Sequence, residues 1–543
     1  MRLLLAAAAL LLRGAARAAR FELASVLGDN AVLQRDTDTI VWGFASADMV
    51  GAPVYGTLVD TLTQATWAVQ SAVEADGAWR LAMPRRPGAP SPYNLYISTA
   101  PAPAEHKFDG LTLVLSNLVF GDVIFASGQS NMELTFSLVF NATEEAAFAD
   151  TVGAAVRIFE AAPSVASSTP LDQLARVLVP WSVASSASLP PFSATAWFTA
   201  KSLLLSRTGD DARVPLGIAV STWGGTGIRA WQGPAGNAKC QPLYPFNASQ
   251  PLLDCSSSSY HAPCNNSMLH NALVNPYMVG PMKVASLVWY QGENDCNPAE
   301  LASGYYACQL VQLAESWRSG LGSPNASWST VQLAPWDQSG LATLAEFRSM
   351  QASATASIPR SHTAVLVDGG DATSPYGHVH SRNKQLTGRR VAAGILALLY
   401  GNATVPTVGP TFASATYGMA SQGGSLSVNV SFVPGTVGAG GLVWVPPTVS
   451  PWGNSTRCPT EVPHFAPASC GWFEIVGSDQ HAYNVTRVEI LGVGDGATLR
   501  LTADNVPSLV TARGSRFGWA DWPVVNVYGQ DGAMPVVPWN DYS

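Results

Sequence analysis

Four short apolar runs organise the middle of the chain, and each of them stops at a polar segment that contains glycine. The runs are 122–126, 216–220, 285–289 and 363–367. Longer stretches with helix-like patterning separate them, and apolar residues recur at helical spacing from Gly388 to Tyr400. Strands that alternate with helices predict βαβ units joined in a parallel sheet. We therefore expect an α/β domain over residues 118–400.

The segments on either side of this domain are patterned as β structure. Polar and apolar residues alternate in 39–43, 54–59 and 93–98, with Gly, Pro and Asp between them. This pattern predicts an all-β sandwich over residues 19–117. Residues 401–543 return to short strands, Pro and Gly and predict a second β region. A chain of 543 residues corresponds to two to four domains, which agrees with this division.

The first eighteen residues have the pattern of a secretory signal peptide. A basic start, Met1-Arg2, precedes an apolar run over 3–12 and a small-residue cleavage site, Ala16-Arg17-Ala18. The alternative is a transit peptide, because the segment is rich in Ala and Arg and lacks acids. Eight N-x-S/T sequons favour secretion. They begin at Asn141, Asn247, Asn265, Asn325, Asn402, Asn429, Asn454 and Asn484. We expect a glycoprotein that is extracellular or lies in a lysosomal or vacuolar lumen.

The seven cysteines follow the predicted cleavage site and cluster at close spacings, as disulfides in an oxidising compartment do. Cys458 and Cys470 stand apart in the last third and form the best-defined predicted pair. We also expect Cys296 to pair with Cys308. One of Cys240, Cys255 and Cys264 is then left over. Zinc is disfavoured, because the chain has no C-x-x-C motif and no paired histidine spacing.

Composition excludes several classes of protein. Hydrophobic residues make up 47% and charged residues 12%, about half of the usual charged share of roughly 25%. A disordered chain needs the opposite balance. A net charge of −8 argues against nucleic-acid binding, which requires a basic face. No apolar run of 18 residues follows the N-terminus, so we expect no membrane span in the mature chain.

The polar segments that follow the four runs carry the candidate chemistry. In open α/β sheets, ligands bind beyond the carboxyl ends of the strands. The first segment supplies a serine on a turn, the second a glycine pair, the third amide donors and the fourth an imidazole, which are the parts of an acyl-transfer site. The segments are 127–133, 221–226, 290–295 and 368–371 with 378–384.

These segments resemble the four signature blocks of the SGNH hydrolases, in their sialate O-acetylesterase branch. The matching stretches are GDVIFASGQSNME, STWGGTGIRAW, WYQGEND and HVHSRNKQ. The resemblance extends over nearly the whole chain and implies a flavodoxin-like, three-layer catalytic domain with a parallel sheet, flanked by β-sandwich-like regions. It implies removal of O-acetyl groups from sialic acids. Relatives with the same blocks deacetylate plant polysaccharides such as xylan.

The resemblance assigns roles to particular residues. Ser130 matches the nucleophile and His380 the histidine base. The oxyanion hole comprises the N–H groups of Ser130 and Gly225, with Gly224 as the alternative glycine. The third block leaves two amide donors open, Gln291 and Asn294. We favour Gln291, because the match to WYQGE is the longer one.

Other block residues are expected to support the site. These are Gln129, Asn131 and Glu293, with Glu293 as a buried partner of the GQSNM loop rather than an acid catalyst. Gly227 and Arg229 replace the Pro and the acidic residue that are usual in the second block. This departure places the substrate preference in doubt, but not the reaction type.

The third member of the triad is missing from its usual position. Gly377 and His378 stand where related enzymes carry an aspartate before the histidine. Asp368 and Asp371 are the acids upstream. We expect a Ser–His dyad in which a main-chain carbonyl orients His380, and Asp371 remains open as a displaced acid.

The sequence thus predicts a secreted serine esterase that acts on an O-acetylated sugar, with sialic acids as the first substrate class. It predicts no metal and no organic cofactor. The alternatives are a polysaccharide acetylesterase of the acetylxylan type and a carbohydrate-binding pseudoenzyme.

Overall fold

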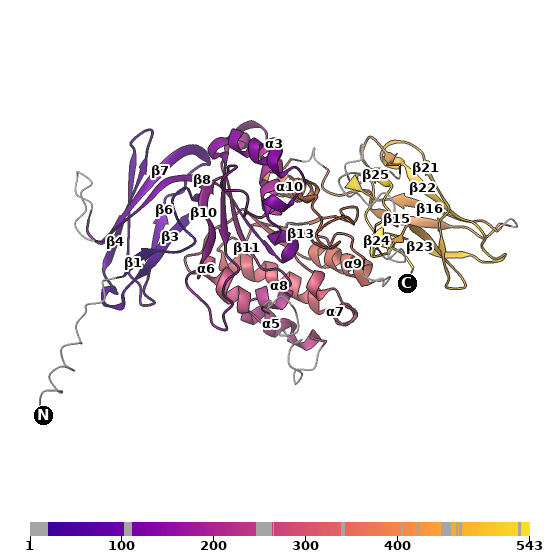
Figure 1. Cartoon of the computed structure of the whole chain (residues 1–543), viewed down its shortest axis with the longest axis horizontal. Coiled ribbons are helices and arrows are strands. Elements are labelled where there is room, and N and C mark those ends of the chain that lie inside the picture. Colours follow the sequence, from indigo (N-terminus) through magenta and orange to yellow (C-terminus); the bar gives the residue numbers. More distant parts are fainter. Residues whose placement is uncertain are drawn as a thin grey trace, which may run out of the picture.

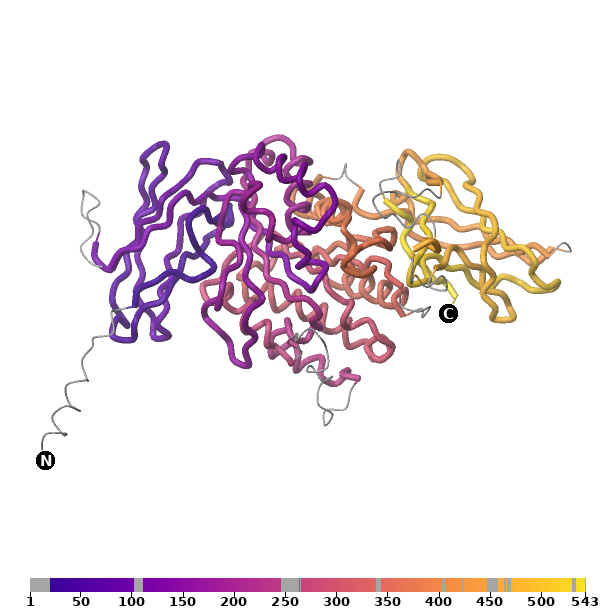
Figure 2. The backbone as a smooth tube through the Cα atoms, in the orientation of Figure 1, coloured from indigo at the N-terminus to yellow at the C-terminus, as the bar shows by residue number. Residues whose placement is uncertain are grey.

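A computed structural model of the chain describes residues 20–101, 111–245, 263, 265–337, 343–402, 406–421, 424–446, 458–462, 465, 470–529 and 534–542. Its elements form an N-terminal β region, a central α/β domain and a C-terminal β region, arranged along the long axis of the molecule (Figure 1). The backbone passes through the three regions in sequence order (Figure 2). The predicted signal peptide lies outside the described residues.

The central domain contains the predicted parallel sheet. Its strand order is β10-β9-β11-β8-β12-β13-β14, and all neighbours are parallel except β10 and β9. Each of the four apolar runs forms part of one strand, although the last strand ends at Ala364. β9, β10 and β13 are strands that the sequence did not indicate. The bounds are β8 Thr112–Gly128, β9 Val156–Ala161, β10 Val177–Val183, β11 Leu216–Thr222, β12 Ser286–Tyr290, β13 Ser327–Val331 and β14 Ser361–Ala364.

Helices cover both faces of this sheet. α3 and α10 lie together on one face, and α5, α8 and α9 lie on the other (Figure 1). Gly388 allows α3 and α10 to approach closely, because a side chain there would meet the Phe198 backbone at 2.4 Å. No described helix has the length and apolar character needed to cross a membrane. The longer helices are α2 Ala142–Thr151, α3 Ala194–Ser206, α5 Pro234–Cys240, α7 Pro298–Ser303, α8 Tyr305–Gly320, α9 Thr343–Ala356 and α10 Lys384–Tyr400, and the short ones are α1 Ser130–Glu133, α4 Ile228–Trp231 and α6 Asn275–Met278.

The N-terminal β region shares a strand with the central domain. β8 is 17 residues long and crosses residue 117, where we expected one domain to end. Its first part pairs antiparallel with β7 as far as Phe120, and its second part pairs parallel with β11 from Asp122. The other strands are β1 Phe21–Leu23, β2 Val32–Gln34, β3 Thr39–Ala45, β4 Pro53–Asp60, β5 Thr66–Ala72, β6 Ala78–Met83 and β7 Ala89–Ser98.

The C-terminal β region consists mainly of two four-stranded sheets, ordered β15-β16-β22-β21 and β20-β19-β23-β27. Its buried core includes Val365 and Val367, which follow β14 of the central domain. The two regions are therefore packed together. The strands are β15 Phe412–Tyr417, β16 Leu426–Phe432, β17 Leu442–Trp444, β18 Cys470–Gly471, β19 Phe473–Gly477, β20 Ala482–Asn484, β21 Arg487–Leu491, β22 Thr498–Ala503, β23 Ala512–Phe517, β24 Trp522–Pro523, β25 Val527–Gly529, β26 Met534–Pro535 and β27 Trp539–Asn540.

The structure corrects one predicted disulfide. Cys458 and Cys470 are bonded, as expected. Cys308 pairs with Cys240 rather than with Cys296, because Cys308 on α8 and Cys240 at the end of α5 have Cα atoms 5.8 Å apart. Cys296 is a half-buried free thiol.

Some predicted cysteines and sequons cannot be placed. Cys255, Cys264, Asn247 and Asn454 lie outside the described residues. None of the six described sequon asparagines is buried.

Candidate active site

Ser130 stands directly after the central strand of the parallel sheet. From β8 the chain passes first to β9 and β11 on one side and later to β12 on the other, so Ser130 lies where the winding direction changes. Ligands of open α/β sheets bind at this position. The turn requires glycine at Gly128, where φ is +153° and a side chain would come within 2.0 Å of the Tyr290 carbonyl oxygen. The Gln129 N–H donates to that carbonyl at 3.1 Å.

His380 lies on the loop between β14 and α10 and contacts Ser130. The distance from His380 Nε2 to Ser130 Oγ is 2.8 Å. The other ring nitrogen, Nδ1, lies 2.6 Å from the main-chain oxygen of Tyr376. A carbonyl accepts only, so Nδ1 carries the proton and Nε2 is left free to accept the serine proton. This is the arrangement of a serine nucleophile with its base.

The environment of His380 favours its neutral form. Burial lowers the pKa of His380, and the positive charge of Lys384 lowers it further, against the opposing effect of the Tyr376 carbonyl. A neutral imidazole is the form that can take a proton from the serine.

The second-block loop lies against Ser130. A Cβ on Gly224 would be 3.5 Å from Ser130 Cβ and 2.8 Å from a Glu133 carboxylate oxygen, so the close approach depends on glycine. The Glu133 carboxyl group therefore lies close to Gly224, and burial raises its pKa. Gly225 is exposed, with φ at +69°.

The two candidate amide donors of the third block have different surroundings. Gln291 is fully buried, and its Nε2 donates to Gln129 Oε1 at 3.1 Å, to the Thr226 carbonyl at 3.0 Å and to Asp295. The structure thus places Gln291 in the framework beneath the loops, and not at the exposed surface where an oxyanion would form. These contacts favour Asn294 over Gln291, and the donor role that we predicted for Gln291 stays a prediction.

Asn294 is the exposed amide of this block. In the orientation that satisfies its neighbours, Oδ1 accepts from the Gly227 N–H and Nδ2 donates to the Gly225 carbonyl, both at 3.2 Å. Proline has no N–H, so glycine at position 227 makes this contact possible. Asn294 therefore lies beside the glycine loop that faces Ser130.

Gln129, one of the expected supporting residues, ties the first block to the third. Its side-chain oxygen accepts from the Gly292 N–H at 3.3 Å and from the Asn294 N–H at 3.2 Å. The residue itself is 3% exposed.

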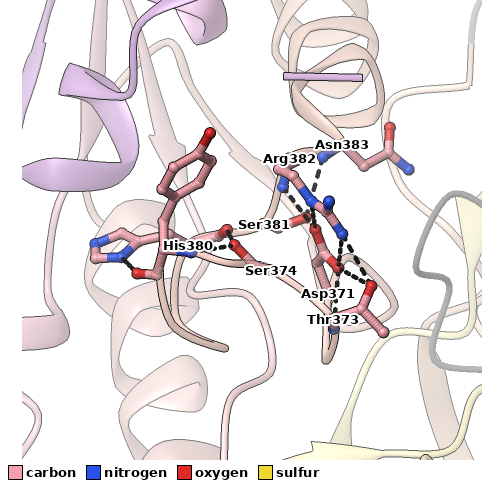
Figure 3. Close-up of polar contacts among 8 residues, drawn as sticks. Asp371, Thr373, Ser374, His380, Ser381, Arg382 and Asn383 are labelled. Atoms are coloured by element: carbon pink, nitrogen blue, oxygen red, sulfur yellow. Dashed lines mark hydrogen bonds and ion pairs between the residues drawn. The ribbon is translucent and has the colours of Figure 1, made fainter. Parts of the chain in front are cut away.

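Neither upstream acid contacts His380. Asp371 accepts from Arg382 Nε at 2.7 Å, from Arg382 Nη2 at 3.0 Å and from Thr373 Oγ1 at 3.1 Å, and the labelled His380 ring lies apart from this cluster (Figure 3). Burial alone would raise the pKa of Asp371, but the bonds from Arg382 lower it below its ordinary value. Asp368 pairs with Arg390 and accepts from the Tyr528 hydroxyl at 3.0 Å. In this structure Asp371 contacts Arg382 and Thr373, which favours the Ser–His dyad, and its role as a displaced acid stays an untested prediction.

Two residues at the site were missed from the sequence. Tyr376 offers His380 only its main-chain oxygen, so its side chain gave no signal. Lys384 lies within the quoted HVHSRNKQ stretch and is fully buried beside Asn131. Its burial could not be seen from the sequence. No group of three or more His, Cys, Asp or Glu side chains suited to a metal ion occurs among the described residues.

Comparisons with known proteins find similarity to carbohydrate esterases. Residues 121–397 match the family model described as carbohydrate esterase, sialic acid-specific acetylesterase. Sialate O-acetylesterases of Pongo abelii and Homo sapiens are each 30% identical over 413 residues, covering 72% of this chain and 73% of the relative. A carbohydrate acetylesterase from Xanthomonas citri superposes with a TM-score of 0.70 at 25% identity, over 96% of this chain and 99% of that one.

Proposed function

The chain belongs to the sialic acid-specific acetylesterase family of carbohydrate esterases and is a carboxylic ester hydrolase, and we propose that it cleaves acetyl esters of sugars through an acyl-enzyme on Ser130. The observation that carries this mechanism is the contact of 2.8 Å between Ser130 Oγ and His380 Nε2. The proton on Nδ1 is fixed by the Tyr376 carbonyl.

In the first half-reaction, Ser130 Oγ attacks the acetyl carbonyl carbon and His380 Nε2 takes the hydroxyl proton. The tetrahedral intermediate collapses as the C–O bond to the sugar breaks, and His380 returns the proton to the leaving sugar oxygen. In the second half-reaction, His380 deprotonates a water that attacks acetyl-Ser130. Acetate leaves, and the serine recovers its proton.

The oxyanion of both intermediates needs donors that face Ser130. We assign this role to the N–H groups of Ser130 and Gly225 and to the side-chain amide of Asn294. Gly225 and Asn294 are exposed, and they lie on the loop and the turn that flank the nucleophile. Donors in such a position are fixed before charge develops, which is the basis of their catalytic effect. Gly224 is the weaker candidate, because the Glu133 carboxyl group lies close to it.

In the proposed dyad, no carboxylate of the described residues bonds to the His380 ring. The Tyr376 carbonyl orients the ring, and the leaving group is an alcohol, which is easier to expel than an amine. Asp371 and Arg382 hold the loop that carries His380.

The sugar that we propose first is an O-acetylated sialic acid, after the relatives at 30% identity. Acetylated polysaccharide is the second candidate, because the Xanthomonas citri enzyme is described only as a carbohydrate acetylesterase. We also propose that the chain enters the secretory pathway. Its leader-like N-terminus supports this, as do the two disulfides and the unburied sequons among the described residues.

Acetate release tests the function. We expect the purified chain to hydrolyse 4-nitrophenyl acetate and to release acetate faster from O-acetylated sialic acid than from acetylated xylan. Preference for xylan would move the chain to the polysaccharide esterases. Binding of acetylated sugars without hydrolysis of either ester would show a pseudoenzyme instead.

A further inference from the structure

Lys384 is a buried cation at the start of α10. Its relative exposure is 0%, and its Nζ donates to Asn131 Oδ1 at 2.6 Å. The ammonium also lies 5.2 Å from the centre of the Tyr290 ring. Asn131 directly follows the nucleophile, so this lysine contacts the nucleophile turn from the opposite end of the catalytic domain's sequence.

The Asn131 side chain also bonds to the third block and to the loop that carries His380. Its Nδ2 donates to Glu293 Oε1 at 2.6 Å and to the main-chain oxygen of Val379 at 2.9 Å. Val379 precedes His380, and Glu293 belongs to the third block. Because an amide has distinct donor and acceptor ends, the lysine bond at Oδ1 fixes Nδ2 toward Glu293 and Val379.

This position is unfavourable for a lysine on local grounds. Burial disfavours the charged form and lowers the pKa of Lys384 to about 7, although the charges of Glu293 and Asp371 favour it. Lys384 is also the first residue of α10, where the helix dipole disfavours a cation. A residue that is unfavourable for burial and for its position in a helix, as Lys384 is, is expected mainly at functional sites.

We propose that Lys384 is a positioning residue, which fixes the Asn131 amide so that Asn131 holds the Val379 carbonyl and thereby aligns His380 with Ser130. The inference rests on the proposed Ser130–His380 mechanism and adds a residue to it. Lys384 does not touch the reacting atoms, and its effect reaches them through Asn131.

The proposal has an electrostatic signature that a purely structural role would lack. The charge of Lys384 lowers the pKa of His380. The charged or titratable groups that face Lys384 are Glu293, Asp371 and His380, together with the ring face of Tyr290. Loss of the lysine charge therefore raises the pKa of His380 and moves the acidic limb of kcat/KM to higher pH.

The test compares Lys384→Met, which removes charge and donor, with Lys384→Gln, which removes the charge but keeps a donor. We expect Lys384→Met to lower kcat about 10²-fold, the size of a misalignment effect, with a smaller change in KM. Lys384→Gln should keep more of kcat and show the same shift of the acidic limb. Lys239→Met, at an exposed lysine of α5, is the matched control and should change neither.

A double-mutant cycle tests the route through Asn131. If Lys384 acts through that amide, Lys384→Met should cost little in an Asn131→Ala background, so the two effects are not additive. Additive effects would overturn the proposal. An unchanged kcat with an unshifted acidic limb in folded Lys384→Met would overturn it too. If Lys384→Met does not fold, the pH dependence of kcat/KM is measured on Lys384→Gln.

The rate at which a fluorophosphonate labels Ser130, measured as a function of pH, distinguishes the role of Lys384 from the proposed Ser130–His380 mechanism. Slower labelling of the Lys384 variants, with the shifted pH midpoint, supports positioning. Equal labelling of wild type and variants overturns the role of Lys384 alone. A wild-type chain that neither labels nor hydrolyses esters overturns the proposed function together with this inference.

Discussion

The two halves of the candidate dyad are held in different ways. Ser130 stands on a short turn whose geometry is fixed by neighbouring backbone, through the Gly128 contact and the Gln129 bond to Tyr290. His380 stands on a long loop between β14 and α10, which is fixed by side chains: the buried pair of Asp371 with Arg382, and the Ser374 hydroxyl donating to the His380 carbonyl at 2.6 Å (Figure 3). The serine position thus depends on main-chain contacts with the adjacent strand β12, whereas the histidine position depends on side-chain contacts within its own loop.

The largest expected effect is on the turn. Ser130→Ala should lower kcat about 10⁴-fold or more, since the nucleophile is lost. The melting temperature should stay near that of wild type, because the backbone and not the hydroxyl holds this turn. Acetate release and thermal unfolding measure the two quantities, and Ser137→Ala, an exposed serine nearby, is the control. Near-normal acetate release by Ser130→Ala would contradict the mechanism.

The next effect distinguishes the two third-block amides. Asn294→Ala should lower kcat by about 10²-fold, as loss of one oxyanion donor does, with little change in stability because the side chain is exposed. Gln291→Ala should mainly lower the melting temperature, since it removes the side-chain donor to the buried Thr226 carbonyl and leaves Asp295 with the Ile228 N–H but without the Gln291 amide. The reverse pattern would return the donor role to Gln291.

A smaller effect on rate is expected from the histidine loop. Asp371→Asn should lower kcat by about tenfold and stability by about 3 kcal/mol, because one partner of a buried ion pair loses its charge. Asp368→Asn, at the pair with Arg390, should lower stability and leave kcat near wild type. A fall of about 10⁴-fold in kcat for Asp371→Asn would show a triad acid after all.

The smallest effect concerns the pH of half-maximal activity. The pKa of His380 is lowered by burial and by Lys384, so the neutral base persists below the ordinary histidine pKa of about 6.5. The acidic limb of kcat/KM, measured with a sugar acetate between pH 4 and 8, should therefore have its midpoint below pH 6.5. A midpoint above this value would show that the loop leaves the ring in a different environment.

The length of sequence over which each pattern extends explains which parts of the fold could be predicted. The parallel strands at the four apolar runs and the helix ending at Tyr400 were predicted, because each pattern is complete within a few residues. β9 and β13 were missed because they bury polar side chains. Arg157 and Glu160 lie within β9 at 1% exposure each, and the Ser327 hydroxyl of β13 bonds to Ser286 at 2.8 Å.

The candidate site shows the same limit. The position of the GQSNM turn at the end of a parallel strand could be predicted, because the motif directly follows an apolar run. The choice between Gln291 and Asn294 depended on which side chain points into the framework, and motif length favoured the buried one. Asp371 remained a candidate acid because its partner Arg382 lies eleven residues further on, beyond the reach of a local pattern.

Strand β8 determines which regions of this chain can be exchanged with a related protein without breaking the fold. Its 17 residues begin in the N-terminal sheet and end at the turn that presents Ser130, so a chain started at residue 118 would enter the enzyme partway along its central strand. The Arg157 guanidinium, which donates to the Asn30 carbonyl at 3.0 Å, would lose an acceptor as well. The N-terminal β region is therefore no detachable accessory. A recombined chain that keeps the Ser130 turn intact must therefore contain the N-terminal β region and the central α/β domain together.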